Sequence, residues 1–354
     1  MNYSKLKLLV ARNIKLYFKD KVTFYMSLIT PLILLVLFVT FLKDVYIQTL
    51  TQSLPDGITL SSTLLNGFAG GWLMSSIMGV ICVTIAFCSN IVMVYDKING
   101  NIKDIYITPT SKQLINLSYF IANFISTFIV CTITALVGFI YLGIVGFYLS
   151  FGDCLMIILV TFITCLLGCL LASVIERFIN SQGGVSAVAT LVSSIYGFIC
   201  GAYMPISQFK EPIRNIVSFN PGTYSVILFR NFYLNGTLNE MSNDLPPETI
   251  TAIKNAFDGN FYFFGIQVTT TAQYLVVLST IALSAVAFIL LSKFHKPKQS
   301  PKRQKIINNK WRNNKIIEKW KNNLNQKNSI NSCGVFLYFK LYKNLFFSFY
   351  AHKF

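Results

Sequence analysis

Six long, continuously apolar stretches constrain this chain more than any other feature of its sequence. Each is close to the ~20 residues that an α-helix needs to cross the ~30 Å hydrocarbon core of a bilayer. They are continuous rather than alternately apolar and polar, which excludes a closed β-barrel. The sequence therefore predicts an all-α polytopic membrane protein with six transmembrane helices, at residues 22–42, 68–94, 118–142, 154–175, 185–203 and 272–292.

Lys and Arg are unequally distributed among the segments that connect these runs. They concentrate in residues 1–21, 95–117 and 293–354, and Arg177 follows the fourth run. Because Lys and Arg favour cytoplasmic loops, we expect both termini of this multi-pass protein to lie on the cytoplasmic side of the plasma membrane. The formal net charge of +17 then attracts the protein to the anionic inner leaflet of the lipid bilayer. We expect no nucleic-acid binding, because most of the chain lies in lipid.

The composition also argues against chemistry inside the membrane. Only 12% of the residues are charged, and the two histidines, His295 and His352, both follow the last run. We therefore expect no catalytic site and no metal site. No GxxxxGK[ST] pattern occurs, so we expect no nucleotide site and no bound cofactor in this chain. The eight cysteines include no CxxC pair, and we interpret them as free, buried, small apolar side chains.

Residues 1–21 are predicted to form an amphipathic connecting helix that lies flat in the cytoplasmic interface. The alternative is a basic flank that merely obeys the positive-inside rule. On a helical wheel the basic side chains share one arc, opposite Leu6, Val10, Ile14 and Tyr17. The basic residues of this arc are Lys5, Arg12, Lys15 and Lys19.

The segment 95–117 is nearly the only polar stretch between two apolar runs, and we interpret it as a cytoplasmic coupling loop. Gly100 permits a sharp bend, residues 102–107 predict a short helix with an apolar side, and Pro109 ends it. A charged elbow of this kind is suited to act as a docking surface for another protein. The residues expected to couple there are Asp96, Lys97, Gly100, Lys103, Asp104, Thr108 and Pro109.

The outer segment 204–234 is too apolar for a solvated loop, and prolines divide it. We expect re-entrant helices at about 207–219 and 222–234, separated by Asn220-Pro221. Residues 235–271 are predicted to be an ordinary exposed outer loop. The basic stretch 293–354 is expected to be a disordered cytoplasmic tail, or a non-native read-through of coding sequence.

Taken in order, these features resemble the membrane subunit of an ABC exporter of the type-2 permease family. The resemblance covers about residues 1–292. In that family the loop after the second span carries an acidic-basic pair, a Gly, a short helix and Thr-Pro, as do Asp96-Lys97, Gly100 and Thr108-Pro109 here. Its outer gate follows the fifth span, where the matching residues are Gly201, Pro205, Pro212, Asn220, Pro221, Tyr224 and Arg230.

The resemblance implies a transport subunit without enzymatic activity. Two copies of the permease, or one copy with a sister permease, would form the pathway. Two copies of a separate ATPase subunit would dock on the N-terminal helix and the 95–117 loop, so that ATP acts through the partner. Two alternatives stay open: a motor-free carrier, channel or lipid scramblase, and a membrane-embedded enzyme. The absence of acidic residues in mid-span argues against an ion-coupled carrier.

Overall fold

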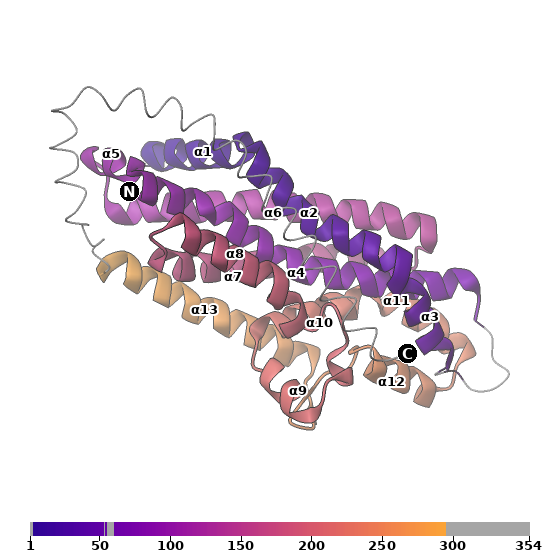
Figure 1. The fold of residues 1–354 in the computed structure, drawn as a ribbon. Helices are drawn as coiled ribbons and strands as arrows, with labels where there is room; N and C mark the ends of the chain where they lie inside the picture. The colour runs from indigo at the N-terminus through magenta and orange to yellow at the C-terminus, as the bar shows by residue number, and fades with distance from the viewer. Residues whose placement is uncertain (1–2, 53, 55–59, 295–354) are drawn as a thin grey trace. The chain divides into compact units, whose positions relative to one another are not determined.

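The computed structural model describes residues 3–52, 54 and 60–294, so the predicted tail lies almost wholly outside the described residues. The described chain is built almost entirely of helices (Figure 1). Their order is α1 Tyr3–Lys19, α2 Lys21–Leu37, π-helix η1 Phe38–Leu42, α3 Lys43–Gln52, α4 Ser62–Asn99, α5 Asn101–Ile107, α6 Lys112–Val145, α7 Phe151–Ile175, 3₁₀ helix η2 Glu176–Phe178, α8 Gln182–Ile199, 3₁₀ helix η3 Ile206–Gln208, α9 Glu211–Val217, α10 Pro221–Tyr233, α11 Asn235–Asp244, α12 Pro247–Ala256, β1 Tyr262–Phe263, β2 Ile266–Gln267 and α13 Thr270–Phe294.

Five of the described helices are long and apolar enough to cross a membrane: α4, α6, α7 with η2, α8 and α13. They coincide with the second to sixth predicted runs. The first predicted run is divided differently, because α2 has 17 residues and passes directly into η1 and then α3. The helical path from Lys21 to Gln52 is therefore continuous, although no single helix within it matches the predicted span.

Helix α4 is the centre of the bundle, and it is buried along most of its length. It packs against α6, α7, α10, α2 and α8. Its 38 residues correspond to a length of about 57 Å at 1.5 Å per residue. Since the hydrocarbon core is only ~30 Å thick, α4 is long enough to cross it and to extend well beyond it.

Serine side chains define where four of the long helices begin. A serine hydroxyl before each helix accepts a hydrogen bond from a backbone N–H of the first turn, which satisfies a donor that the helix itself leaves unpaired. Ser150 adds a full capping box, because the side chain of Asp153 also accepts from the Ser150 backbone. The four capping residues are Ser61, Ser111, Ser150 and Ser181.

The helices run up and down, so alternate connections meet at the same end of the bundle. One end, called here the elbow end, holds α1, α5, the start of α6, η2 and the end of α13 (Figure 1). The other end holds the start of α4, the end of α6, the start of α7 and α9–α12. Among the described residues, the segments predicted to be cytoplasmic thus share the elbow end, and those predicted to be external share the other.

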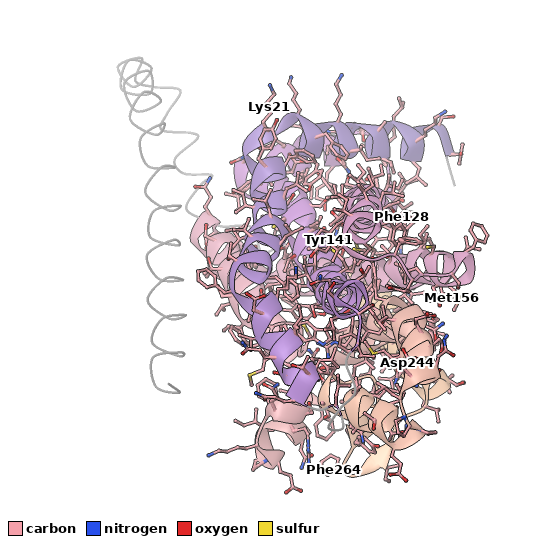
Figure 2. The ribbon with its side chains drawn as sticks, turned by 90° about the vertical axis from the view of Figure 1, so that its right-hand side faces the viewer. Lys21, Phe128, Tyr141, Met156, Asp244 and Phe264 are labelled. Carbon is pink, nitrogen blue, oxygen red and sulfur yellow. The ribbon has the colours of Figure 1, made fainter. Side chains whose placement is uncertain are left out.

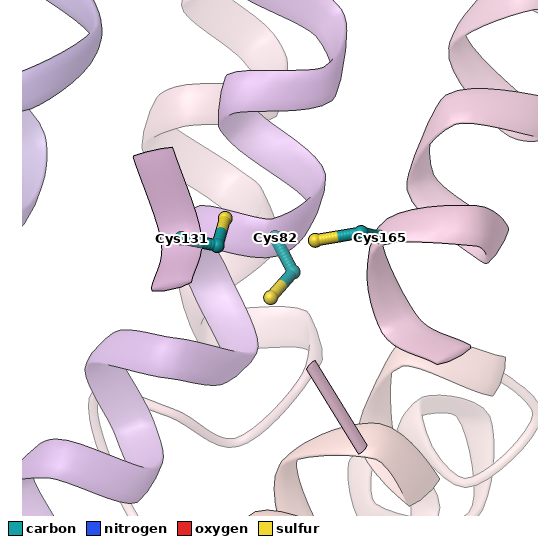
Figure 3. A group of neighbouring side chains, drawn as sticks. All are labelled: Cys82, Cys131 and Cys165. Atoms are coloured by element: carbon teal, nitrogen blue, oxygen red, sulfur yellow. The ribbon is translucent and has the colours of Figure 1, made fainter. Parts of the chain in front are cut away.

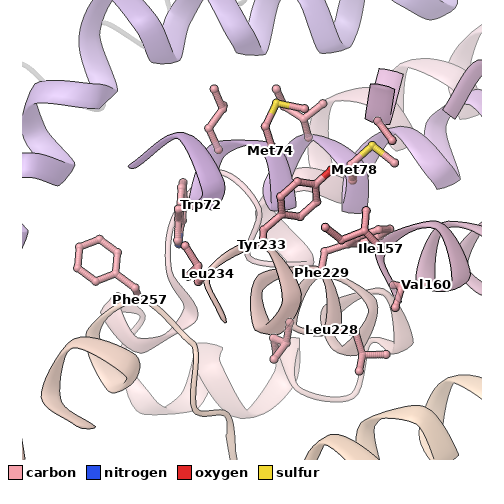
Figure 4. Close-up of a cluster of buried hydrophobic side chains, with 14 of the residues drawn as sticks. Trp72, Met74, Met78, Ile157, Val160, Leu228, Phe229, Tyr233, Leu234 and Phe257 are labelled. Atoms are coloured by element: carbon pink, nitrogen blue, oxygen red, sulfur yellow. The ribbon is translucent and has the colours of Figure 1, made fainter. Parts of the chain in front are cut away.

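The apolar core lies where α4, α7 and α10 meet. Trp72 and Met78 of α4 contribute to this core together with Phe229 and Tyr233 of α10, while Met74 of α4 points toward Gly138 of α6 (Figure 4). Trp72, Met74, Met78, Phe229 and Tyr233 are all nearly inaccessible to solvent. In contrast, α6 and α13 turn large apolar side chains outward, including Ile140 at 67% and Leu283 at 71% exposed. An apolar outer surface of this kind is suited to lipid rather than water.

Residues 235–271 differ from the expected exposed loop. They form α11, α12 and the hairpin of β1 and β2, because buried side chains such as Met241, Ile253 and Phe257 give these helices an apolar face. The Phe257 ring packs edge-on against Phe68 at the start of α4, with 5.0 Å between ring centroids. In Figure 2, Asp244 of α11 and Phe264 of the hairpin turn lie far from Lys21 at the start of α2.

Candidate functional site

The elbow between α4 and α5 is a sharp bend at Gly100. Its φ of 88° lies in the left-handed region, which glycine adopts without the strain a Cβ would add. The bend both ends α4 and begins α5, and the backbone N–H of Lys103 donates to the Gly100 carbonyl at 2.9 Å. Helix α5 then ends at Ile107, with extended backbone at Thr108 before Pro109.

Asp96, in the last turn of α4, is the hub of this end. Asp96 is only 4% exposed to solvent. The two terminal guanidinium nitrogens of Arg12 on α1, Nη1 and Nη2, donate to the carboxylate at 2.6 and 3.2 Å. The Tyr119 hydroxyl of α6 donates at 2.6 Å and the Asn101 amide of α5 at 3.0 Å. One carboxylate therefore joins α1, α4, α5 and α6, through charge-assisted hydrogen bonds that exceed neutral ones in strength.

Helix α1 presents two different sides to its surroundings. Its buried side, with Leu6, Asn13 and Tyr17, packs mainly against α6. Lys15 and Lys19 are exposed, whereas Arg12 turns to Asp96, whose hydrogen bond raises the pKa of the Arg12 guanidinium. The Lys5 ammonium donates to the Pro109 carbonyl at 2.9 Å. Of the four predicted basic residues, Lys5 and Arg12 therefore bind the elbow, while Lys15 and Lys19 remain on the surface.

Lys97 links the elbow to a second turn at the same end. Its ammonium donates to the backbone carbonyls of Arg177 at 2.6 Å and Ile179 at 3.1 Å. The Arg177 guanidinium in turn donates to the Ser292 hydroxyl of α13 at 3.1 Å. The predicted pair Asp96-Lys97 therefore does two jobs, since Asp96 binds α1, α5 and α6 while Lys97 binds the connection between α7 and α8.

The outer side of α5 forms a protruding surface, the α5 knob, defined by Lys103, Asp104, Ile107, Thr108 and Pro109. All five residues are exposed, and the Ile107 side chain is 84% exposed. The other side of α5 is anchored, because Ile102, Ile105 and Tyr106 pack against the cluster around Ile115 and Tyr119. The knob is thus a small apolar tip with charged neighbours on a fixed base.

A small cavity of about 10 Å³ lies next to the hydrogen bonds around Asp96, lined by residues of α1, α4 and α6. Asn90 Oδ1, Asn123 Nδ2 and Ser126 Oγ line it without a hydrogen-bond partner among the described residues. The Asn90 amide also donates to the buried Glu176 carboxylate at 2.9 Å. A polar cavity of this size is sufficient for about one water molecule.

At the opposite end, the predicted gate residue Arg230 is the centre of a second network. It is fully buried, and its guanidinium pairs with Asp258 at 2.7 Å. It also donates to the Gly201 carbonyl and lies over the Trp72 ring, 4.8 Å from the ring centroid. Burial lowers the pKa of Arg230 and the Asp258 charge opposes that shift. Asp258 further accepts from the backbone N–H of Ser207 at 2.9 Å.

The remaining predicted gate residues define the helices around Arg230. Asn220 caps α10, accepting from the Gly222 N–H at 3.2 Å, and Pro221 is its first residue. Pro205 precedes η3, while Pro212 is exposed in the first turn of α9. Tyr224 is buried and packs edge-on against Phe261, with 5.3 Å between centroids. All seven residues therefore lie at one end, with Gly201 and Arg230 in direct contact.

A family model for the ABC-2 type transporter matches residues 4–234 of the chain, which is well over half its length. The chain belongs to this family. The match extends from α1 to the end of α10 and so includes Asp96 with its hydrogen-bond partners and all seven predicted gate residues, whereas Asp258, the partner of Arg230, lies beyond it. A comparison with curated proteins finds no match. The expected family is confirmed, and the protein is a multi-pass membrane protein of ABC-2 type.

Sequence reasoning missed several partners in this ABC-2 transporter chain. It did not identify Tyr119 and Asn101 as donors to Asp96, or Asp258 as the partner of Arg230. An arginine within an apolar helix does signal that a carboxylate must lie nearby, because a buried charge is paired. Residues 235–271 offer several acidic candidates, however, and only the fold selects Asp258.

Proposed function

We propose that this chain is the permease subunit of an ATP-driven exporter. A separate ATPase subunit binds at the α5 knob and drives its conformational change. Membership of the ABC-2 family supports a permease that pairs with an ABC ATPase. The sequence has no GxxxxGK[ST] loop, so ATP hydrolysis is assigned to the partner. In this proposal the elbow end faces the cytoplasm, and α2 with η1 forms the first of six spans.

The observation that carries the proposal is the convergence of four helices on Asp96. A partner that pushes the α5 knob also pushes Asn101, Asp96, Arg12 and Tyr119, because these side chains are hydrogen-bonded to one another. The displacement is then shared by α1, α4, α5 and α6. Lys97 extends the same linkage to the turn between α7 and α8. The knob can therefore act as a rigid lever on most of the bundle.

The working assembly contains two permease chains, identical or of two related kinds, and two copies of the ATPase subunit. Closure of the ATPase pair upon ATP binding would reorient the helices and expose the pathway outside. The segment around Arg230 would form the exit gate, with α9 and α10 as re-entrant helices in the outer leaflet. We propose an amphipathic cargo, of the drug, peptide, lipid or glycan class, since Ser, Thr and Phe side chains are frequent in the spans.

The proposal is tested by isolating the chain from native membranes and assaying the product for ATP hydrolysis. We expect a stoichiometric second chain that contains a GxxxxGK[ST] loop and hydrolyses ATP. Replacing Ile107 by Asp places a charge at the 84% exposed tip of the knob, which should reduce recovery of the ATPase at least tenfold. Insertion and folding should be unaffected, because Ile107 contributes little to packing within the chain.

The matched control is Ile266→Asp, which alters a similarly exposed isoleucine, 72% accessible, in the hairpin at the opposite end. This variant should retain the ATPase fully. If the purified wild-type chain transports cargo in vesicles with no ATP-hydrolysing partner, the motor-free alternative is correct instead. If Ile107→Asp and the wild type recover equal amounts of the ATPase, the α5 knob is not part of the docking surface.

A further inference from the structure

Three cysteines from three different helices converge in the centre of the bundle. Cys82 of α4, Cys131 of α6 and Cys165 of α7 have their sulfur atoms all within 4.8 Å of one another (Figure 3). Each of the three side chains is completely inaccessible to solvent. The sequence alone predicts eight unrelated thiols, because these three residues are separated by tens of positions and form no local motif.

We propose that Cys82, Cys131 and Cys165 form a binding site for one soft monovalent metal cation of the Cu(I) class. Thiolate ligands select soft cations such as Cu(I) over Mg²⁺ or Ca²⁺. With the ~2.3 Å metal–sulfur bonds of zinc thiolates as a guide, a trigonal planar site requires sulfur atoms about 4.0 Å apart. The observed upper limit of 4.8 Å therefore leaves only a small side-chain adjustment to make.

The apolar surroundings favour a bound complex without net charge, and the ligand number favours Cu(I), because Zn²⁺, a divalent ion that thiolates also bind, takes four ligands in structural sites and this cluster offers three. The cysteines lie in the hydrophobic middle of α4, α6 and α7, where a net charge is costly to bury. One Cu(I) that displaces one thiol proton leaves the site neutral, with one thiolate and two thiols as ligands. The reaction is Cu⁺ plus three thiols giving the bound complex and one H⁺, which passes to solvent. No electron is transferred, and no oxidant is needed.

Metal binding here would fasten three long helices to one another. The cation would replace weak contacts between sulfur atoms by three metal–sulfur bonds, one to each of α4, α6 and α7. Because an ion that binds only the folded protein stabilises it by mass action, the loaded protein should melt at a higher temperature. This site is independent of the α5 knob, so its presence can be tested without knowledge of the transported cargo.

The experiment compares two complementary variants of the full chain in detergent. In the first, Cys82, Cys131 and Cys165 are all replaced by Ala. The second retains these three and carries Ala at the other five cysteines, namely Cys88, Cys154, Cys169, Cys200 and Cys333. Each is loaded anaerobically with buffered Cu(I), and in parallel by expression in copper-supplemented medium. Bound copper is counted after gel filtration, and its ligands are identified by X-ray absorption.

We expect one copper per chain, with sulfur-only coordination, in the wild type and in the second variant. The first variant should bind at least tenfold less and should show no copper-dependent rise in melting temperature. If the first variant does not fold, the single change Cys131→Ala takes its place, since it removes one ligand only. Copper retained after loss of the three cysteines, or absent from wild type and second variant under both loading conditions, would overturn the proposal.

Discussion

Two buried charges show how single residues organise the two ends of this molecule. Asp96 accepts hydrogen bonds from three helices other than its own, and Arg230 binds Asp258, Gly201 and Trp72 from three distant segments. A buried ion whose partners are all in place is tolerated, whereas removing one partner leaves the other charged and unsolvated. The cost of substitution should therefore be large at both positions.

Replacing Arg230 by Gln should destabilise the protein by about 3–5 kcal/mol, because Asp258 then remains buried without its counter-charge. The measurement is thermal unfolding of the purified chain in one detergent. The double variant Arg230→Gln/Asp258→Asn should recover part of this loss, since neither side chain then carries a charge. Arg214→Gln, a change of the other α9–α10 arginine at a half-buried site, should cost far less. Equal losses in Arg230→Gln and Arg214→Gln would contradict this description.

At the scale of helices, close approach between backbones decides how α4 and α7 pack. A Cβ added to Gly168 of α7 would lie 2.7 Å from the Cys82 carbonyl oxygen and 3.0 Å from the Val83 Cα, both backbone atoms of α4. Backbone cannot move aside as a flexible side chain can. Small residues allow this kind of contact between membrane helices, so the identity of Gly168 is tied to the geometry of the core.

Gly168→Ala should therefore destabilise the bundle by about 1–3 kcal/mol, the usual cost of overpacking. Gly143→Ala on α6 is the matched control, because a Cβ there meets nothing within 4 Å. That change should be neutral or stabilising by up to ~1 kcal/mol, since Ala favours a helix more than Gly does. Melting temperatures of the two variants, measured side by side, should thus move in opposite directions or differ clearly. A lower melting temperature for Gly143→Ala than for Gly168→Ala would refute the proposed packing.

The sequence predicts helices well wherever an apolar run is long, and less well where tertiary contacts decide. The five runs that correspond to α4, α6, α7, α8 and α13 were identifiable from length and hydropathy. Helices α11 and α12 were not, because their buried residues are spaced among polar ones and gain their apolar partner only when Phe257 meets Phe68. Likewise, Gly100 signals a bend, but nothing local indicates that Asp96 would bind Arg12, 84 residues earlier.

At the scale of the whole molecule, the central claim is that the ATPase subunit moves the elbow end of the bundle and that the exit gate opens at the opposite end. The elbow end carries the α5 knob and the helices joined through Asp96. The opposite end carries Arg230 and the helices around it. In the proposed orientation these ends lie on opposite sides of the membrane, connected by α4, which is long enough to span the hydrocarbon core and project beyond it.

Accessibility of two introduced cysteines, one per variant, at the exposed positions Asp104 of the knob and Asp244 of α11, tests this claim most directly, because the five native cysteines that remain are buried. The background lacks Cys88, Cys154 and Cys333, and the reagent cannot cross membranes. We expect Asp104→Cys to react only in vesicles with the cytoplasmic face outward, and to be protected when the ATPase subunit is bound. Asp244→Cys should react only in intact cells, with or without the ATPase. Reaction of Asp104→Cys from outside the cell, or no protection by a bound ATPase, would contradict the claim.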